Sequence, residues 1–339
     1  MAKTLKKLIL FSFILLITCG VLGFSYFNSQ IKPVDPYNIV EKKIVIPKGS
    51  TTNDIANLLN ENKLISSKLI FKILAKKEGK DGKLKAGKYS LNSGMSMTEI
   101  LYKIAKGDTD KETVTFTIPE GYELKEIADR LANLGLVNRK VFLDLTSKVS
   151  NFSNEYEFLK KIPQNISLEG YLFPDTYEVF KDSKEEEIIK KMLDRFDEVY
   201  QTLIKKEIKK STLSLHEIIT LASIIEREGK LDSERKLISA VFYNRLNKGW
   251  YLQSCATVQY VLGERKQNLT YDDLKIDSKY NTYLYNGLPP GPIASPGSMS
   301  IEAALKPAEV DYLFFVSNGD GSHTFTKSLK EHINAKNKK

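Results

Sequence analysis

The chain has 339 residues, of which 27% are charged, and its formal net charge is +9 at pH 7. This length leaves room for two or three domains. The two cysteines are too few for a disulfide framework, and the three histidines lack the spacing of metal ligands, so we expect no metal site.

The amino-terminal segment 8–27 carries no charged side chain and is long enough to cross a membrane as a helix. Three lysines in residues 1–7 precede it, and this asymmetry favours a cytoplasmic amino terminus. A cleaved signal peptide is the alternative, but no alanine occurs between Ala2 and Ala56 to form the usual cleavage site. We therefore expect a single-pass membrane anchor and a short, stiff linker at 28–39, with the rest of the chain outside the cytoplasm.

The basic net charge would ordinarily suggest a nucleic-acid partner. A location outside the cytoplasm argues against nucleic acid as that partner. Scattered lysines fit either a loose attraction to an anionic membrane or cell wall, or simple solvation of the surface.

An internal duplication follows the linker. Segments 44–65 and 116–137 match at a constant offset, which pairs Gly49 with Gly121. Each copy has the pattern of a short strand, a glycine turn and an amphipathic helix, and a looser third copy lies between them. Duplication of this kind predicts small α+β modules sharing one core, which we place at 40–148.

The stretch 214–229 predicts a buried helix. Ser214 and Glu217 form a capping box at its start, and Gly229 marks its end. Residues 218–225 are apolar except for two small hydroxyl side chains, so most sides of this helix are expected to be covered. At 3.6 residues per turn, one stripe contains Leu215, Ile219, Ala222 and Glu226.

Glu226 is the candidate catalytic residue, because an apolar stripe disfavours the charged form of the carboxylate that ends it. A carboxylic acid that stays protonated near neutral pH can act as a general acid. Glu228 falls on the opposite side of the helix. The alternative is that both glutamates simply solvate the end of the helix, beside Arg227 and Lys230.

The sequence resembles the endolytic murein transglycosylases of bacterial membranes over nearly its whole length. The resemblance rests on a series of motifs in the order of that family: EGYLFPDTY (169–177), LASIIEREG (221–229), VFYNRL (241–246), LQSCATVQYVLGER (252–265), YNTY (280–283), GLPPGPIASPG (287–297) and GSHTF (321–325). The first glutamate of the SI[IV]E-x-E segment is catalytic in that family, and it maps onto Glu226. Many members carry Asp-Pro where this chain has Cys255-Ala256, so a carboxylate at that position is not essential here.

Four residues in these motifs are candidate substrate contacts: Gln253, Asn281, Tyr283 and His323. Each also has a structural interpretation as a packing or loop-fixing residue. Glu169 is a second candidate carboxylate, with a structural hydrogen bond to a turn as its alternative. Cys255 is poorly suited to be a nucleophile, because no histidine stands near it in the local sequence.

The sequence therefore predicts an α+β protein with a transmembrane helix, small duplicated modules and an α+β catalytic domain at 149–339, and the family resemblance implies that the modules are LysM-like. LysM folds often hold N-acetylglucosamine polymers, so the modules either bind glycan or act as a spacer. The resemblance implies a lytic transglycosylase of peptidoglycan glycan strands, with no cofactor and with cell-wall synthases as expected partners. A hydrolytic muramidase, which needs a second carboxylate such as Glu169 or Glu228, and a non-catalytic wall-binding scaffold are the alternatives.

Overall fold

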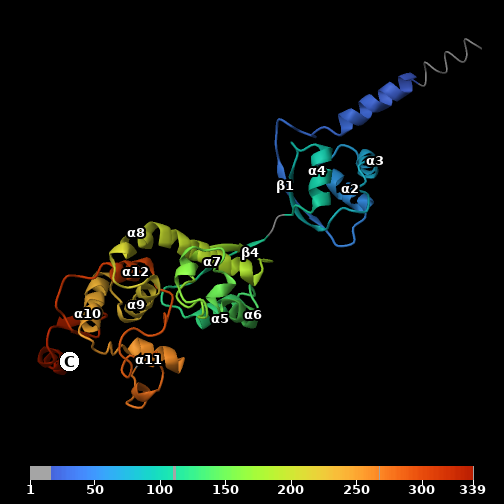
Figure 1. Cartoon of the computed structure of the whole chain (residues 1–339). Helices are drawn as coiled ribbons and strands as arrows, with labels where there is room; N and C mark the ends of the chain where they lie inside the picture. The colour runs from blue at the N-terminus through green and yellow to red at the C-terminus, as the bar shows by residue number, and fades with distance from the viewer. Residues whose placement is uncertain (1–16, 110–111, 267, 339) are drawn as a thin grey trace, which may run out of the picture. The chain divides into compact units, whose positions relative to one another are not determined.

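The computed structural model describes residues 17–109, 112–266 and 268–338, and it divides the chain into two compact units (Figure 1). The first unit is Met1–Glu112 and the second is Thr113–Lys339. The packing therefore places the boundary at 112/113, whereas the duplication predicts it at 148/149. Residues 113–148, which carry the second copy of the duplication, belong to the second unit.

The first unit is a two-stranded antiparallel sheet covered by three helices. Its elements in chain order are β1 (Glu41–Ile46), α2 (Thr52–Glu61), α3 (Lys68–Lys77), β2 (Gly87–Asn92) and α4 (Met97–Lys106). Ile44 and Ile46 alternate inward along β1, and Tyr89 lies opposite Ile44 on β2. Their core is continuous with the buried faces of the three helices and is separate from the core of the second unit.

The expectation of a membrane-spanning helix at 8–27 is wrong for the residues that the structure describes. Residues 17–30 are helical, and no helix in the described ranges is both long and apolar enough to cross a membrane. Residues 8–16 of the expected span lie outside the described residues. Phe27, at the end of that span, instead packs against the core of the first unit, with the Lys77 ammonium 5.5 Å from its ring centre.

The second unit is largely helical and has two separate two-stranded sheets. Its strands are β3 (Thr113–Thr117), β4 (Thr176–Phe180), β5 (Phe314–Ser317) and β6 (His323–Thr326), with β3 antiparallel to β4 and β5 antiparallel to β6. Its α-helices are α5 (Leu124–Asn133), α6 (Arg139–Thr146), α7 (Glu185–Val199), α8 (Lys205–Glu207), α9 (Leu215–Glu228), α10 (Arg235–Asn247), α11 (Cys255–Leu262), α12 (Ser298–Leu305) and α13 (Leu329–Asn337). Short 3-10 turns and a π-helical turn at Tyr200–Ile204 connect some of these elements. The α+β composition expected from the sequence is confirmed.

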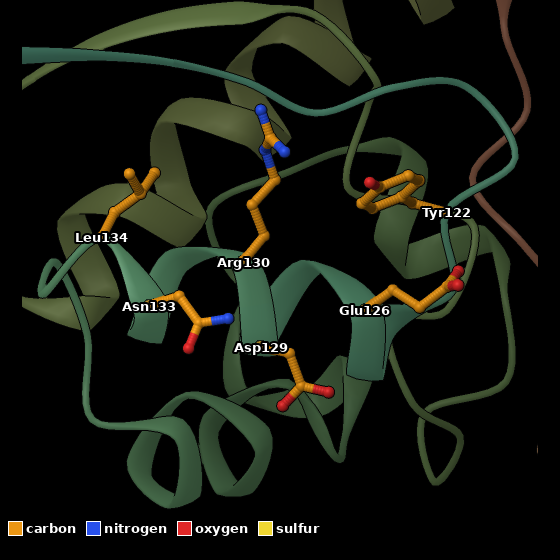
Figure 2. Close-up of a pocket in the computed structure, with 6 residues that line it drawn as sticks. All are labelled: Tyr122, Glu126, Asp129, Arg130, Asn133 and Leu134. Carbon is orange, nitrogen blue, oxygen red and sulfur yellow. The ribbon is translucent and has the colours of Figure 1, made fainter.

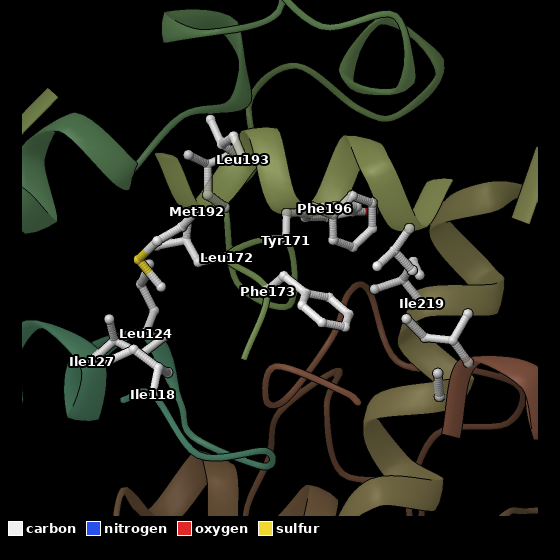
Figure 3. Close-up of a cluster of buried hydrophobic side chains, with 14 of the residues drawn as sticks. Ile118, Leu124, Ile127, Tyr171, Leu172, Phe173, Met192, Leu193, Phe196 and Ile219 are labelled. Atoms are coloured by element: carbon white, nitrogen blue, oxygen red, sulfur yellow. The ribbon is translucent and has the colours of Figure 1, made fainter. Parts of the chain in front are cut away.

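Helix α9 forms the centre of the second unit. Every residue from Ile218 to Ile225 is buried, and α10, α11 and α12 pack around it. Figure 3 shows Ile219 of α9 in the same buried cluster as Tyr171, Phe173 and Phe196. The capping box of Ser214 and the stop at Gly229 are both present, so this helix is as the sequence predicts.

The strand, turn and helix of each repeat are also confirmed. Gly49 follows β1 with a φ of 83°, and Gly121 follows β3 with a φ of 74°, a left-handed conformation that glycine adopts without strain. Each turn leads into a ten-residue amphipathic helix with a capping box. The two copies differ in their surroundings, because β1 pairs with β2 of its own unit while β3 pairs with β4.

This division predicts that a fragment of residues 26–109 folds alone, since its core contains side chains of the first unit only. Its thermal unfolding followed by circular dichroism should be a single cooperative transition. Extending the fragment to residue 145 should leave the midpoint unchanged, because β3 and α5 would lack β4 and the second core. A higher midpoint for the longer fragment would show that the boundary lies near 148 instead.

Candidate active site

Glu226 lies in the last turn of α9 with only 6% of its side chain exposed. One carboxylate oxygen, Oε1, forms an ion pair with Nη1 of Arg235 at 3.1 Å. The other, Oε2, accepts a hydrogen bond from the backbone N–H of Gly297 at 3.0 Å. A single carboxyl group thus has a cation on one oxygen and a fixed amide donor on the other.

Arg235, at the start of α10, is nearly as buried as Glu226. Its guanidinium also donates to Asp232 at 2.8 Å and to the hydroxyl of Ser300 on α12. Three contacts from three elements therefore fix its orientation. A buried ion pair of this kind requires such additional hydrogen bonds, because its desolvation cost can exceed its Coulombic gain.

A second carboxylate, Glu120, lies beside this pair and was not among the predicted site residues. It stands in the turn between β3 and α5, and a Cβ atom added to Gly297 would overlap its carboxyl group. Desolvation, followed by the negative charge of Glu226, raises the pKa of Glu120, while Arg235 opposes this shift. The one hint in the sequence is a difference between the two repeats: the second has Glu120 where the first has Lys48.

Glu228 faces away from Glu226 and lines a separate cavity of about 390 Å³. This cavity brings together three of the four predicted substrate contacts, and its lining includes Glu228, Arg245, Gln253, Cys255, Tyr283, Phe314, Phe315 and His323. The hydroxyl of Ser254 donates to Oε1 of Glu228. A mixture of aromatic faces, an amide and a carboxylate is the composition expected of a small polar-ligand site.

Two of the predicted contacts are held firmly in place. His323 Nδ1 lies 2.8 Å from Oε2 of Glu234, and its backbone N–H donates to Oε1 of the same carboxylate at 3.1 Å. Tyr283 has its hydroxyl 3.1 Å from the sulfur of Cys255, and burial raises the pKa of Tyr283. Gln253 has a φ of 51°, an uncommon conformation for a residue with a side chain.

Asn281 is the predicted contact that the structure does not bring to the cavity. It is 0% exposed, and its Nδ2 donates to the carbonyl groups of Leu274 and Ile276, each at 2.9 Å. Its Oδ1 accepts from the backbone N–H of Tyr283 at 3.0 Å. The amide therefore fixes the loop that presents Tyr283 and has no face left for a ligand.

Cys255 reaches the surface, but its sulfur is partly desolvated, and this raises the pKa of the thiol. The thiolate is the nucleophilic form, so the local environment disfavours covalent catalysis by this residue. In the described parts of the chain, no three His, Cys, Asp or Glu side chains converge in a way that could hold a metal ion.

Glu169 has the structural role that was its alternative. Both carboxylate oxygens accept from the backbone N–H of Leu124, at 2.9 and 3.1 Å, at the start of α5. Burial raises the pKa of Glu169 to about 8, and the hydrogen bond from Leu124 opposes this effect. The residue lines a cavity of about 430 Å³ beside Tyr260 and Tyr280.

Another cavity, of about 450 Å³, runs along the exposed side of α5 next to the Glu120 turn (Figure 2). It is lined by Tyr122, Glu126, Asp129, Arg130, Asn133 and Leu134. Figure 2 shows these side chains on one helix and its flanking turns, with Arg130 and Asp129 pointing to different sides of the helix. The acids and amide along it give a polar surface that begins two residues after Glu120.

The chain is similar to one family and to several named proteins of bacteria. The YceG-like family matches residues 44–338. A protein of Bacillus subtilis named endolytic murein transglycosylase is 38% identical over 328 residues, which cover 93% of this chain and 89% of that protein. A Streptococcus pneumoniae protein of the same name is 33% identical over 348 residues, covering 94% of this chain and 63% of that protein.

A solved structure agrees with these matches. The crystal structure of a yceG-like protein from Listeria monocytogenes is similar with a TM-score of 0.60 and 38% sequence identity, covering 88% of this chain and 100% of that one. The chain belongs to the YceG-like family.

The Glu169 carboxyl group predicts a specific pH dependence of stability. Its pKa of about 8 in the folded protein exceeds the ordinary value of 4.5, so its contribution is fully present below pH 4.5 and is lost as the pH rises through 8. Glu169→Gln removes this dependence, and the free energy of unfolding should fall less between pH 5 and 9 than in the wild type. The difference should be a few kcal/mol at most, at about 1.4 kcal/mol per pKa unit. Urea unfolding at the two pH values gives the free energy of unfolding of each protein. The same change in that free energy between pH 5 and 9 for the variant and the wild type would contradict the raised pKa of Glu169.

Proposed function

We propose that the protein is an endolytic lytic transglycosylase that cuts peptidoglycan glycan strands internally. The observation that carries the proposal is the carboxyl group of Glu226, placed at the end of a buried helix between a guanidinium and a backbone N–H. The name shared by the relatives from Bacillus subtilis and Streptococcus pneumoniae supports the substrate and the reaction.

The proposed bond is the β-1,4 linkage between N-acetylmuramic acid and N-acetylglucosamine. Protonated Glu226 donates to the glycosidic oxygen as the bond to C1 breaks through an oxocarbenium-like state. The resulting carboxylate then removes the proton from the muramyl C6 hydroxyl, whose oxygen bonds to C1 and closes a 1,6-anhydro ring. The proton lost by O6 thus ends on O4, and no water is consumed.

The environment of Glu226 suits both halves of this reaction. Arg235 and the Gly297 N–H stabilise the carboxylate formed after the first proton transfer. An intramolecular hydroxyl nucleophile is already near C1, so no second group has to position a water molecule. One carboxyl group can therefore act first as the acid and then as the base.

The cavity beside Glu228 is the proposed binding site for a sugar of the strand. Aromatic rings of Phe314 and Phe315 offer apolar faces, while Gln253, Tyr283 and Glu228 offer hydrogen-bonding groups. Sugars present both kinds of surface, with C–H groups on their faces and hydroxyl groups on their edges. The fixed positions of Tyr283 and His323 favour a pocket that is largely formed before the strand binds.

Glu226→Gln should abolish strand cleavage, because glutamine keeps the shape of the side chain but cannot transfer a proton. General acid–base catalysis is typically worth about 10²–10⁴-fold, and the loss should reach or exceed the upper end because both steps need it. Purified glycan strands and mass spectrometry of the products give the measurement. The wild-type product should end in 1,6-anhydro-muramic acid, one water lighter than a hydrolytic end.

Glu228→Gln is the matched comparison, since it makes the same chemical change two residues away. It should raise KM by about tenfold, the loss of one hydrogen bond to a charged group, and leave kcat near the wild-type value. Thermal unfolding of both variants controls for lost folding, because Glu226→Gln leaves Arg235 without its buried partner. Near wild-type cutting by Glu226→Gln would refute its role, and products carrying the extra water would indicate a hydrolytic muramidase.

We also propose that the second unit acts outside the cytoplasm, since murein, the substrate named for the relatives, lies there. A fluorescent reporter that matures only in the cytoplasm, fused after Lys339, should stay dark in the producing bacterium. An exported reporter enzyme at the same position should be active and serves as the control. Bright cytoplasmic fluorescence would overturn this placement.

A further inference from the structure

The turn that follows α10 carries the chain's only tryptophan, Trp250, which is 43% exposed. Tyr251, the next residue, is exposed as well. A second exposed apolar pair, Leu284 and Tyr285, lies in the loop before α12. A single exposed apolar side chain needs no explanation, whereas a group of large ones commonly marks a binding surface.

Hydrogen bonds join the two stretches that carry these side chains. The side-chain amide of Asn286 donates to the carbonyl of Gly249 at 2.9 Å. The backbone N–H of Gln253 donates to the carbonyl of Thr282 at 3.1 Å and continues the contact. The two exposed pairs therefore stand on neighbouring stretches, and we call their four residues the aromatic rim: Trp250, Tyr251, Leu284 and Tyr285.

The aromatic rim borders the cavity beside Glu228. The ring centre of Trp250 lies 6.1 Å from that of Phe314, which lines the cavity. On the other stretch, Tyr283 lines the cavity and directly precedes Leu284. A ligand that extends out of the cavity on this side meets the rim.

Arg245 fixes the backbone beneath the rim. Its buried guanidinium donates to the carbonyl groups of Leu313 at 2.7 Å and Leu252 at 2.8 Å, which joins the Trp250 turn to the residue before β5. The backbone N–H of Trp250 donates to the carbonyl of Arg245 at 2.9 Å. Because rigid aromatic side chains on a fixed backbone lose little conformational entropy, they make efficient contacts with a ligand.

The chemistry of the rim favours a sugar over a lipid surface. Tryptophan and tyrosine combine a flat apolar ring with a polar edge, which matches the C–H faces and hydroxyl edges of a sugar. The hydroxyl of Tyr285 donates to Oδ1 of the exposed Asp277 at 2.6 Å, so a negative charge stands at the edge of the rim. An anionic bilayer would repel that carboxylate, whereas an uncharged sugar ring does not.

We propose that the aromatic rim is an outer binding site for the glycan strand, where Trp250 stacks on a sugar beyond the one held in the cavity beside Glu228. The proposal rests on the transglycosylase function proposed above and extends the bound substrate to several sugars. Trp250 touches the strand away from the bond that is cut and takes no part in the proton transfers. Binding energy from such remote sugars helps to position the reacting bond.

Binding to the rim can be observed directly, because all tryptophan fluorescence of the protein comes from Trp250. Long peptide-free glycan strands, added to the full-length Glu226→Gln protein, should shift the emission to shorter wavelengths, since a stacked sugar removes water from the indole. A peptide-free disaccharide should cause a smaller shift, because the cavity alone can hold it. The wild type, mixed with strands and read before cutting, provides the same measurement. Unchanged emission with long strands would overturn the proposal.

Vesicles of anionic phospholipid test the lipid alternative in the same assay. They should leave the emission of Trp250 unchanged. A shift with vesicles and none with glycan strands would show that the rim faces a membrane, and the proposal would be wrong.

Cleavage kinetics give a second test. Trp250→Ala should lower kcat/KM on long strands by about tenfold, the worth of one aromatic contact, and the loss should shrink as the strands shorten. Trp250→Tyr keeps a ring and should recover most of the activity. Phe180→Ala removes an aromatic ring of similar exposure, 45%, from the end of β4 and should leave the length dependence unchanged. An equal loss at every strand length, with a lower unfolding midpoint, would show that Trp250 only packs on Phe314.

These outcomes separate the inference from the proposed function. If the wild type cuts strands while neither the emission nor the length dependence responds as expected, the rim is no binding site and the transglycosylase function stands. If strands shift the emission of the wild type and are never cut, the rim binds glycan and the proposed function fails.

Discussion

A helix that is covered on all sides leaves only its ends for chemistry, and this constraint governs the second unit. The sides of α9 are buried from Ile218 to Ile225, so the packing of the core fixes where its last turn stands. Two carboxylates in that turn need partners, since an isolated buried charge costs several kcal/mol. Arg235 and the Gly297 N–H meet this need for Glu226, and the Ser254 hydroxyl does so for Glu228.

The features set by local chemistry could be predicted from the sequence. The cap at Ser214, the apolar stripe of α9 and the strand, turn and helix of each repeat depend on neighbouring residues, and all are present. Partnerships across the chain could not be predicted. No local pattern joins Glu120 to Gly297, and the residue type of Asn281 does not say whether its amide faces a ligand or the backbone carbonyls that it binds.

The two largest differences from expectation have related causes. Sequence similarity placed both repeats in one module, but β3 pairs with β4, a strand from beyond the repeats, and so joins the second unit. Apolar composition likewise extended the expected membrane span to residue 27, whereas Phe27 packs on the first unit. In both cases the local sequence pattern does not reveal which distant part of the chain the segment packs against.

The duplication has left two copies under unequal constraint. The turn at Gly49 has open space around it, while the turn at Gly121 is bonded to Ser295 and lies against Glu226 and Arg227. Insertions, deletions and charge changes are therefore tolerable in the first copy and damaging in the second. The core formed by residues before Thr113 is separate from the core around Glu226, so the two copies pack in different surroundings.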